Sequence, residues 1–260
     1  MFSVSSVQLN AWMVMLLWPA ARILAMITVA PLFGHTSIPA TVKVGLGLLL
    51  SVAIAPGLPP LPDVAPFSGD GLLLLVQQML IGFSMGFAMR LVFAAVELAG
   101  ELAALSMGLS FSSFFDPLSQ AQASSVSQFF GWLALMVFVA SNLHLALLAT
   151  LAKSFVALPV SAAPMGMGPF RMLATYGGQV FALGLQLALP IIAALLVTNL
   201  ALGILNKAAP QLNLFGIGFP VTLGAGFLMI AVVLPYLSTP LLAAMEQALT
   251  RISAALAGAG

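Results

Sequence analysis

Ser84 is the first residue whose type and surroundings suggest chemistry. It lies in GFSMG, Gly82 to Gly86, which matches both the GxSxG pattern of hydrolase nucleophiles and the GxxxG pattern of closely packed helices. A nucleophile elbow needs a strand, a sharp turn and a helix, whereas Ser84 lies inside an unbroken apolar stretch. We therefore interpret Gly82 and Gly86 as helix-packing residues. An intramembrane serine hydrolase that uses Ser84 with His144 is the enzymatic alternative.

Other kinds of chemistry find little support in the residue types. The chain has no cysteine, which excludes disulfides, thiolate catalysis and cysteine-ligated metals. His35 and His144 have no nearby carboxylate, so we expect no metal site, and we expect Asn142 and His144 to form hydrogen bonds between helices. Neither a phosphate-binding glycine loop nor a zinc helix motif occurs, and we expect no cofactor. A net charge of +1 without a basic cluster predicts no nucleic-acid binding.

Four charged residues are candidates for an interface. Arg90, Glu97 and Glu101 are spaced by seven and four residues, so they share one face of a helix. Two glutamates at this spacing repel each other unless water, a cation or protonation relieves them. The three residues mark either a helix end in water or a polar stripe docked on another subunit. Arg22 favours the stripe, because it lies too deep in the first apolar segment to reach the membrane surface easily.

A glycine- and serine-rich loop over residues 107–128 collects aromatic side chains. Its sequence, MGLSFSSFFDPLSQAQASSVSQ, gives these aromatics no periodic helix to belong to. One interpretation is a hydrophobic plug that closes a conduit and can move aside. The other, which the residues alone slightly favour, is an aromatic anchor at the membrane surface. The predicted plug residues are Met107, Phe111, Phe114, Phe115, Asp116 and Pro117.

A polar, proline-flanked island, APQLNLFGIGFP, ends at Pro220 and has hydrophobic sequence on both sides. An irregular backbone with amide side chains to satisfy is tolerated at membrane depth only where it is buried in protein or lines a watery cavity. The island therefore predicts a path or a joint between subunits. Its candidate residues are Pro210, Gln211, Asn213, Phe215, Gly218 and Pro220.

Apolar helices must position all of these residues. The chain has 260 residues, 62% of them hydrophobic, with seven basic and six acidic side chains and a mean hydropathy of +1.18. Tracts without charge, such as 172–206 and 208–245, exceed the roughly 20 residues that cross a membrane. We predict an all-α integral membrane protein whose first segment is retained. Six long hydrophobic helices are expected, over 9–30, 40–55, 71–105, 126–153, 170–206 and 220–251.

Proline-rich connections divide these helices. Residues 56–69 read as an exposed loop, and residues 158–169 mark a boundary between a four-helix part and a two-helix part. The fifth segment would be about 50 Å long, so either Pro190 bends it or much of it stands outside the bilayer. The basic residues give no orientation, because they balance on the two sides. A secondary transporter also suits six segments with a broken helix, but we see no internal repeat.

Several motifs, in their order and spacing, resemble the FliR family, the flagellar member of the type III secretion export gate. The related injectisome subunits share the PQxNxF core of the last motif, whereas the usually basic stretch before it is reduced here to Lys207. The matching features are Arg22 with APLFG, the segment 39–59 ending AIAPGLP, GLSFSSFFDP, NLH, the LP at 158–159 and APQLNLFGIGFP.

The resemblance implies a noncatalytic subunit of the flagellar protein export gate in the bacterial inner membrane, at the flagellar basal body. It implies one membrane domain over 1–260, with a FliP-like four-helix part (1–160) followed by a FliQ-like helical hairpin (161–260). The implied partners are FliP-like and FliQ-like subunits in a hetero-oligomer, an FlhB-like switch protein, membrane lipid and unfolded flagellar proteins in transit. It also implies a raised helical channel and favours the plug over the anchor for residues 108–117.

Overall fold

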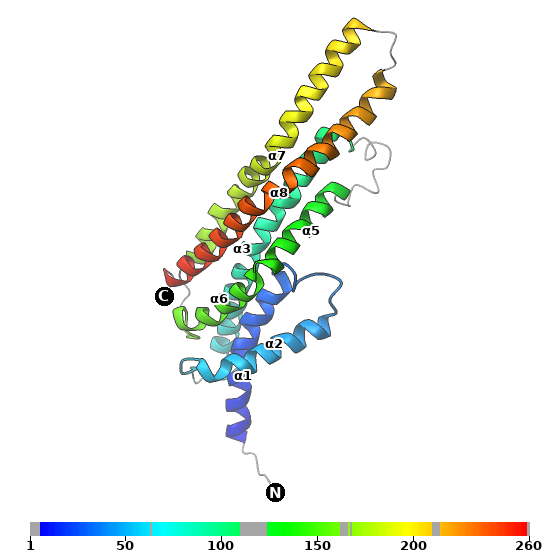
Figure 1. The fold of residues 1–260 in the computed structure, drawn as a ribbon. Helices are drawn as coiled ribbons and strands as arrows, with labels where there is room; N and C mark the ends of the chain where they lie inside the picture. The colour runs from blue at the N-terminus through cyan, green and yellow to red at the C-terminus, as the bar shows by residue number, and fades with distance from the viewer. Residues whose placement is uncertain are drawn as a thin grey trace. The chain divides into compact units, whose positions relative to one another are not determined.

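The computed structural model describes residues 6–62, 64–109, 124–161, 166, 168–209 and 214–258 (Figure 1). Within these ranges the chain is helical and contains no strand, which confirms the predicted all-α class. A short 3-10 turn, η1, follows α2 at Ala55–Gly57. The α-helices are α1 (Ser6–Val29), α2 (Ala40–Ile54), α3 (Gly69–Met107), α5 (Ser125–Ala140), α6 (Leu143–Ala157), α7 (Gly168–Ala208) and α8 (Leu214–Ala257).

Two of the predicted helices need correction. The expected helix over 126–153 is two helices, α5 and α6, separated at Ser141 and Asn142. Asn142 adopts the left-handed conformation, with φ 57° and ψ 19°, which asparagine tolerates better than most residues. The helix expected to begin at Pro220 already begins at Leu214, so Pro220 lies inside α8 together with Pro235 and Pro240. Helices in membrane proteins accept such prolines where neighbouring groups satisfy the freed carbonyls.

The number of candidate membrane spans is also smaller than the predicted six. By length and composition, four described helices could cross a membrane, or five if α5 and α6 together form one broken span. The apolar part of α1, Val14–Val29, is shorter than the others. The four spans are Ala40–Gly57, Gly69–Met107, Arg171–Ala208 and Gly218–Ala257.

The chain forms two compact units that do not follow the order of the sequence. Unit 1 contains Met1–Leu91, Asn142–Gly177 and Met245–Gly260, and unit 2 contains Val92–Ser141 and Gly178–Ala244. The helices α3, α7 and α8 therefore contribute residues to both units. The two parts that the resemblance implies, 1–160 and 161–260, remain a prediction.

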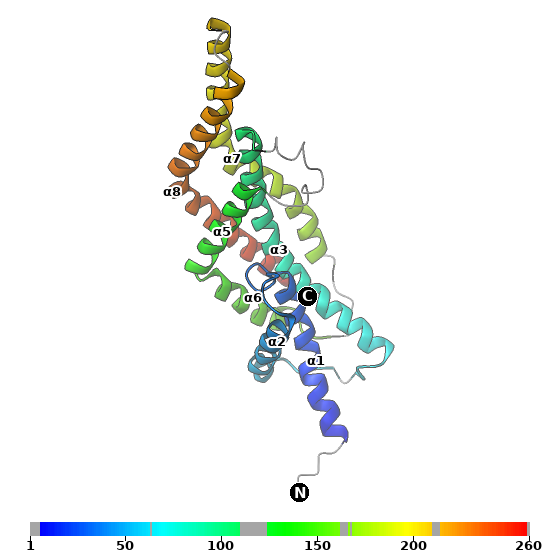
Figure 2. The same ribbon diagram turned by 90° about the vertical axis from the view of Figure 1, so that its right-hand side faces the viewer.

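Unit 1 is built around a close crossing of α1 and α3, which lie side by side in Figure 2. A Cβ atom at Gly86 would lie 2.7 Å from the carbonyl oxygen of Met26, and one at Gly82 would collide with the carbonyl oxygen of Arg22. The two backbones can touch because these positions carry no side chain. On the other side of α1, Gly47 of α2 receives the side chain of Leu24.

Unit 2 packs the second half of α3 against α5. Phe93 and Phe138 meet edge to face with ring centroids 5.7 Å apart, and Phe130 and Ala134 of α5 are buried. Gly100 lies against the backbone of α5, since a Cβ atom there would be 2.6 Å from the Cα atom of Ser127. Small residues thus set the helix spacing in both units.

We expect Gly82→Ala to destabilise the protein, because the new methyl group must push α1 away from α3. Overpacking of this kind costs about 1–3 kcal/mol in the free energy of unfolding. Thermal unfolding in mild detergent, followed by circular dichroism, measures the change. Gly45→Ala on α2 is the matched control, because a Cβ atom at Gly45 meets nothing within 4 Å. Equal melting temperatures for the two variants would contradict the prediction.

Candidate functional site

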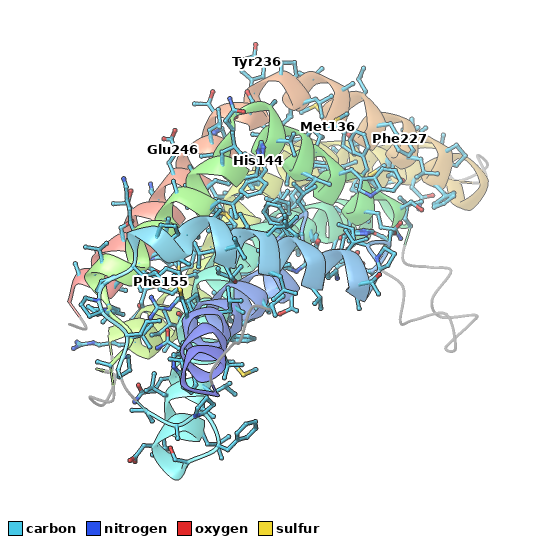
Figure 3. The ribbon with its side chains drawn as sticks, turned by 90° about the horizontal axis from the view of Figure 1, so that it is seen from below. Met136, His144, Phe155, Phe227, Tyr236 and Glu246 are labelled. Atoms are coloured by element: carbon cyan, nitrogen blue, oxygen red, sulfur yellow. The ribbon has the colours of Figure 1, made fainter. Side chains whose placement is uncertain are left out.

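Arg22 is fully buried, with 0% of its surface exposed, in the core of unit 1. Its Nε donates a hydrogen bond to Gln78 Oε1 of α3 at 2.8 Å. Its Nη1 donates to the carbonyl oxygen and to Oγ of Ser154 at 2.9 and 3.1 Å, and its Nη2 donates to the carbonyl oxygen of Leu158 at 2.9 Å. The guanidinium carbon lies 4.2 Å from the ring centroid of Phe155, which Figure 3 labels. We call this set of contacts the arginine cluster.

The arginine cluster joins three helices that are far apart in the sequence. Arg22 belongs to α1, Gln78 to α3 and Ser154 to α6, and the bonds span 56 to 136 residues. The interface prediction placed Arg22 on a polar stripe. The structure places the guanidinium inside unit 1, where it contacts Gln78, Ser154, Leu158 and Phe155 of the same chain.

The sequence analysis did not find the partners of Arg22. The sequence could have pointed to Gln78, because it is one of few strongly polar residues in the charge-free tract 71–89. The structure shows that Gln78 is buried. Leu158 contributes only a backbone carbonyl group, which every residue possesses, whereas Ser154 contributes its hydroxyl as well as its carbonyl group. A search for polar residues able to reach a buried cation would have included Gln78 and Ser154 and missed Leu158.

Glu97 and Glu101 lie at the contact between α3 and α5. Oε2 of Glu101 accepts a hydrogen bond from the backbone nitrogen of Ser124 at 3.2 Å, immediately before α5 begins. Ser127 Oγ donates to the carbonyl oxygen of Glu97 at 2.7 Å. A carboxylate at a helix N-terminus is favoured by the helix dipole. Arg90 lies at an exposed position of α3 in unit 1.

Met107 is the one predicted plug residue that the structure describes. It ends α3, is fully buried and lies against α8, where a Cβ atom at Gly226 would be 2.8 Å from its Sδ. Thr222 Oγ1 donates to its carbonyl oxygen at 3.4 Å. The other predicted plug residues lie outside the described residues; they are Phe111, Phe114, Phe115, Asp116 and Pro117.

The polar island is described only in part. Pro210, Gln211 and Asn213 lie outside the described residues. The backbone of Phe215 lies in the first turn of α8, and Gly218 and Pro220 follow within the same helix. A Cβ atom at Gly218 would meet nothing within 4 Å in the described structure, and Pro220 is exposed. The described chain therefore leaves this turn of α8 uncovered.

The remaining polar candidates have local roles. Ser84 Oγ is buried and donates to the carbonyl oxygen of Ile81 at 2.7 Å, so its hydroxyl is used within α3. His144 lies half-buried on α6, just after the left-handed Asn142 (Figure 3). His35 Nδ1 accepts from the backbone nitrogen of Ser37 at 3.2 Å in an exposed turn. Among the described residues, no group of three histidine or acidic side chains could hold a metal ion.

The fold and this set of contacts define a class of protein. Its described residues are helical, several helices are long and apolar enough to cross a membrane, and large apolar side chains cover the exposed faces of α7 and α8. The buried polar side chains of Arg22, Ser84 and Ser127 form hydrogen bonds inside the bundle, as an apolar surrounding requires. The chain is an all-α membrane protein, as predicted.

Comparisons with known proteins identify the family. The model of a family described as bacterial export proteins, family 1, matches residues 13–248. The chain is 45% identical to the flagellar biosynthetic protein FliR of Pectobacterium carotovorum subsp. carotovorum, over 90% of each chain. It is 44% identical to FliR of Escherichia coli (strain K12), over 92% of this chain and 91% of the relative. With FliR of Bacillus subtilis (strain 168) the identity is 30%, over 81% of this chain and 82% of the relative. The chain belongs to this export-protein family, among the FliR proteins.

Family membership confirms the resemblance seen in the sequence motifs. The chain is a membrane-embedded component of the flagellar export apparatus. It belongs to a family of export components and not to a known family of enzymes. Both facts favour export over the secondary transporter and hydrolase alternatives.

We expect Ser84→Ala to leave flagellar export intact, because the Ser84 hydroxyl is bonded to the carbonyl of its own helix. Loss of one such bond costs about 1 kcal/mol. Swimming motility of a strain that carries the variant as its sole copy measures export. Ser106→Ala is the matched control, since Ser106 Oγ makes the same kind of bond to the carbonyl oxygen of Leu102 at 2.8 Å. Loss of motility in Ser84→Ala alone, at a normal protein level, would support the hydrolase alternative.

Proposed function

We propose that the chain is a noncatalytic subunit of the flagellar type III export gate. In this role it forms part of the channel through which unfolded flagellar proteins cross the bacterial inner membrane at the basal body. The observation that carries the proposal is membership of the export-protein family over residues 13–248. The apolar surface of the chain supports it, since a channel subunit must be covered by lipid and by other subunits.

The exposed apolar surface of α7 and α8 supports assembly with other membrane proteins. Leu196 is 66% exposed in the described chain, and Tyr236, which projects outward from α8 in Figure 3, is 76% exposed. Side chains of this size are rarely left uncovered over a continuous surface. We propose FliP-like and FliQ-like subunits as the neighbours in a hetero-oligomer, with an FlhB-like switch protein in contact.

We also propose that residues 107–117 form the plug of the closed channel. The residues that flank this segment in unit 2 support the idea, because both have fixed contacts. Met107, the first residue of the segment, is buried against Gly226, and Ser124, after the segment, is held by Glu101. A segment whose two flanks are held in place can return to the same position after it has moved aside for a substrate.

Removal of the plug aromatics should open the channel to ions. We expect replacement of Phe111, Phe114 and Phe115 by alanine, or deletion of residues 108–115, to raise ion leak, because the apolar bulk that blocks the path is lost. Conductance of cells or of reconstituted gate complexes measures the leak. The matched control replaces the three neighbouring serines by alanine, at Ser110, Ser112 and Ser113, and should keep the conductance low. Unchanged conductance in the aromatic variant would contradict the plug assignment.

Loss of the island amides should weaken assembly. We expect alanine at both Gln211 and Asn213 to reduce copurification of the neighbouring subunits, because amide groups at membrane depth need hydrogen-bond partners. Co-expression with FliP-like and FliQ-like subunits, extraction in mild detergent and native mass spectrometry measure the complex. Alanine at Gln179 and Gln247, exposed amides elsewhere on α7 and α8, is the control. An intact complex with the double variant would contradict the joint, and a parent chain that ignores these partners would contradict the gate.

A further inference from the structure

The arginine cluster holds a positive charge without an acidic partner. Arg22 is fully buried, and its four hydrogen bonds all go to neutral oxygen atoms. Within the described residues, none of its contacts is with a carboxylate. A buried cation is costly unless negative charge and hydrogen-bond acceptors compensate it. Within the described part of the chain, the compensating charge therefore comes from something other than an acidic side chain.

The end of α6 supplies this negative charge. The last carbonyl groups of a helix have no donor within the helix, and together they carry about half a negative charge. Ser154 belongs to the last turn of α6, and Leu158 is its C-cap residue. The carbonyl oxygens of both accept hydrogen bonds from the guanidinium. Arg22 thus neutralises the C-terminal end of α6 with its charge and with its donors.

α6 does not provide such a group itself. A lysine, arginine or histidine in the last turn often fulfils this role, but the last turn of α6 contains no basic residue. The C-cap residue Leu158 is not in the left-handed conformation that a glycine cap would use, since its φ is −127°. α1 therefore contributes, from 132 residues away in the sequence, the cation that α6 lacks.

The surroundings fix the guanidinium in this orientation. Gln78 accepts from Nε and the ring of Phe155 lies beside the guanidinium, so two neighbours besides the carbonyl groups restrain it. Ser154 Oγ accepts from Nη1 and donates to the carbonyl oxygen of Leu151 at 2.6 Å, which uses both capacities of the hydroxyl. Gly82 allows the backbone of Arg22 to touch α3 and so sets the depth of the side chain.

We propose that Arg22 is a positioning residue that caps the C-terminus of α6 from another helix. It fixes the point at Leu158 where the chain leaves α6 on its way to α7. Without the guanidinium, the carbonyl oxygen of Leu158 loses its donor in an apolar core, and that of Ser154 keeps only the backbone bond from Leu158 at 2.9 Å, so the last turn of α6 opens locally. The rest of α6, which is held by buried side chains such as Leu147 and Leu151, stays in place.

Cysteine accessibility tests this local role, because the chain contains no cysteine of its own. One reporter is Leu158→Cys, at a position that is 7% exposed and whose carbonyl group the substitution retains. The second is Leu147→Cys, which is 0% exposed and three turns earlier in α6. We expect Arg22→Met to raise the rate of maleimide labelling at position 158 by about tenfold or more in the full-length chain. The rate at position 147 should stay unchanged.

Arg22→Lys keeps the charge and guards against a variant that simply fails to fold. A lysine ammonium is a compact charge that cannot match the fork of the guanidinium. In Arg22→Lys we therefore expect an intermediate labelling rate at position 158 and an unchanged rate at position 147. Protection of both reporters in Arg22→Met would overturn the proposal. Equal exposure of both reporters in both variants would overturn it as well, because Arg22 would then hold the whole unit and not the end of α6. Neither outcome depends on whether the chain forms an export channel.

Discussion

A single positive charge in an apolar core constrains the arrangement of unit 1. The guanidinium of Arg22 cannot reach water, so every acceptor for its hydrogen bonds must be brought to it by the fold. α3 brings Gln78, and the end of α6 brings two carbonyl groups. Because hydrogen bonds tolerate only small changes in distance, the positions of α1, α3 and α6 are coupled at this point. The glycines of α3 make the coupling possible, since a side chain at Gly82 or Gly86 would keep α1 too far away.

In unit 2, a negatively charged side chain binds the free backbone group at a helix end. Glu101 accepts from the backbone nitrogen that precedes α5, where the helix dipole is positive, just as Arg22 serves the negative end of α6. In both units, charged side chains from one helix satisfy the free backbone groups at the end of another. Such pairing stabilises helices in an apolar surrounding, because backbone groups lack hydrogen-bond partners at helix ends.

The sequence predicted the helices well where length and composition determine them. α2 and α7 lie within two residues of the expected bounds, because prolines or polar residues flank long apolar stretches. The break at Asn142 was missed, since this left-handed asparagine, between Ser141 and Leu143, has no glycine or proline beside it to mark a turn. Pro220 was wrongly expected to start a helix, although α8 accommodates it internally. The full set of partners of Arg22 could not be predicted either, because two of its four acceptors are backbone carbonyls. The family, in contrast, was identified correctly from the motifs.

The distribution of burial shows what kind of contacts the chain still requires. In α3, 61% of the most apolar window is buried within the chain, whereas the figure is 28% for α7 and for α8 and 11% for the Ala40–Gly57 span. Most of the apolar surface of α3 is therefore covered by its own chain, whereas the apolar surfaces of the other spans need lipid or other subunits to cover them. Lipid tails and apolar helices compete equally for such surfaces, so apolar area alone cannot select a partner. Selection has to come from close fit and from the few polar groups that the chain does not satisfy internally. We propose that Gln211 and Asn213, which the sequence places between α7 and α8, are among such groups.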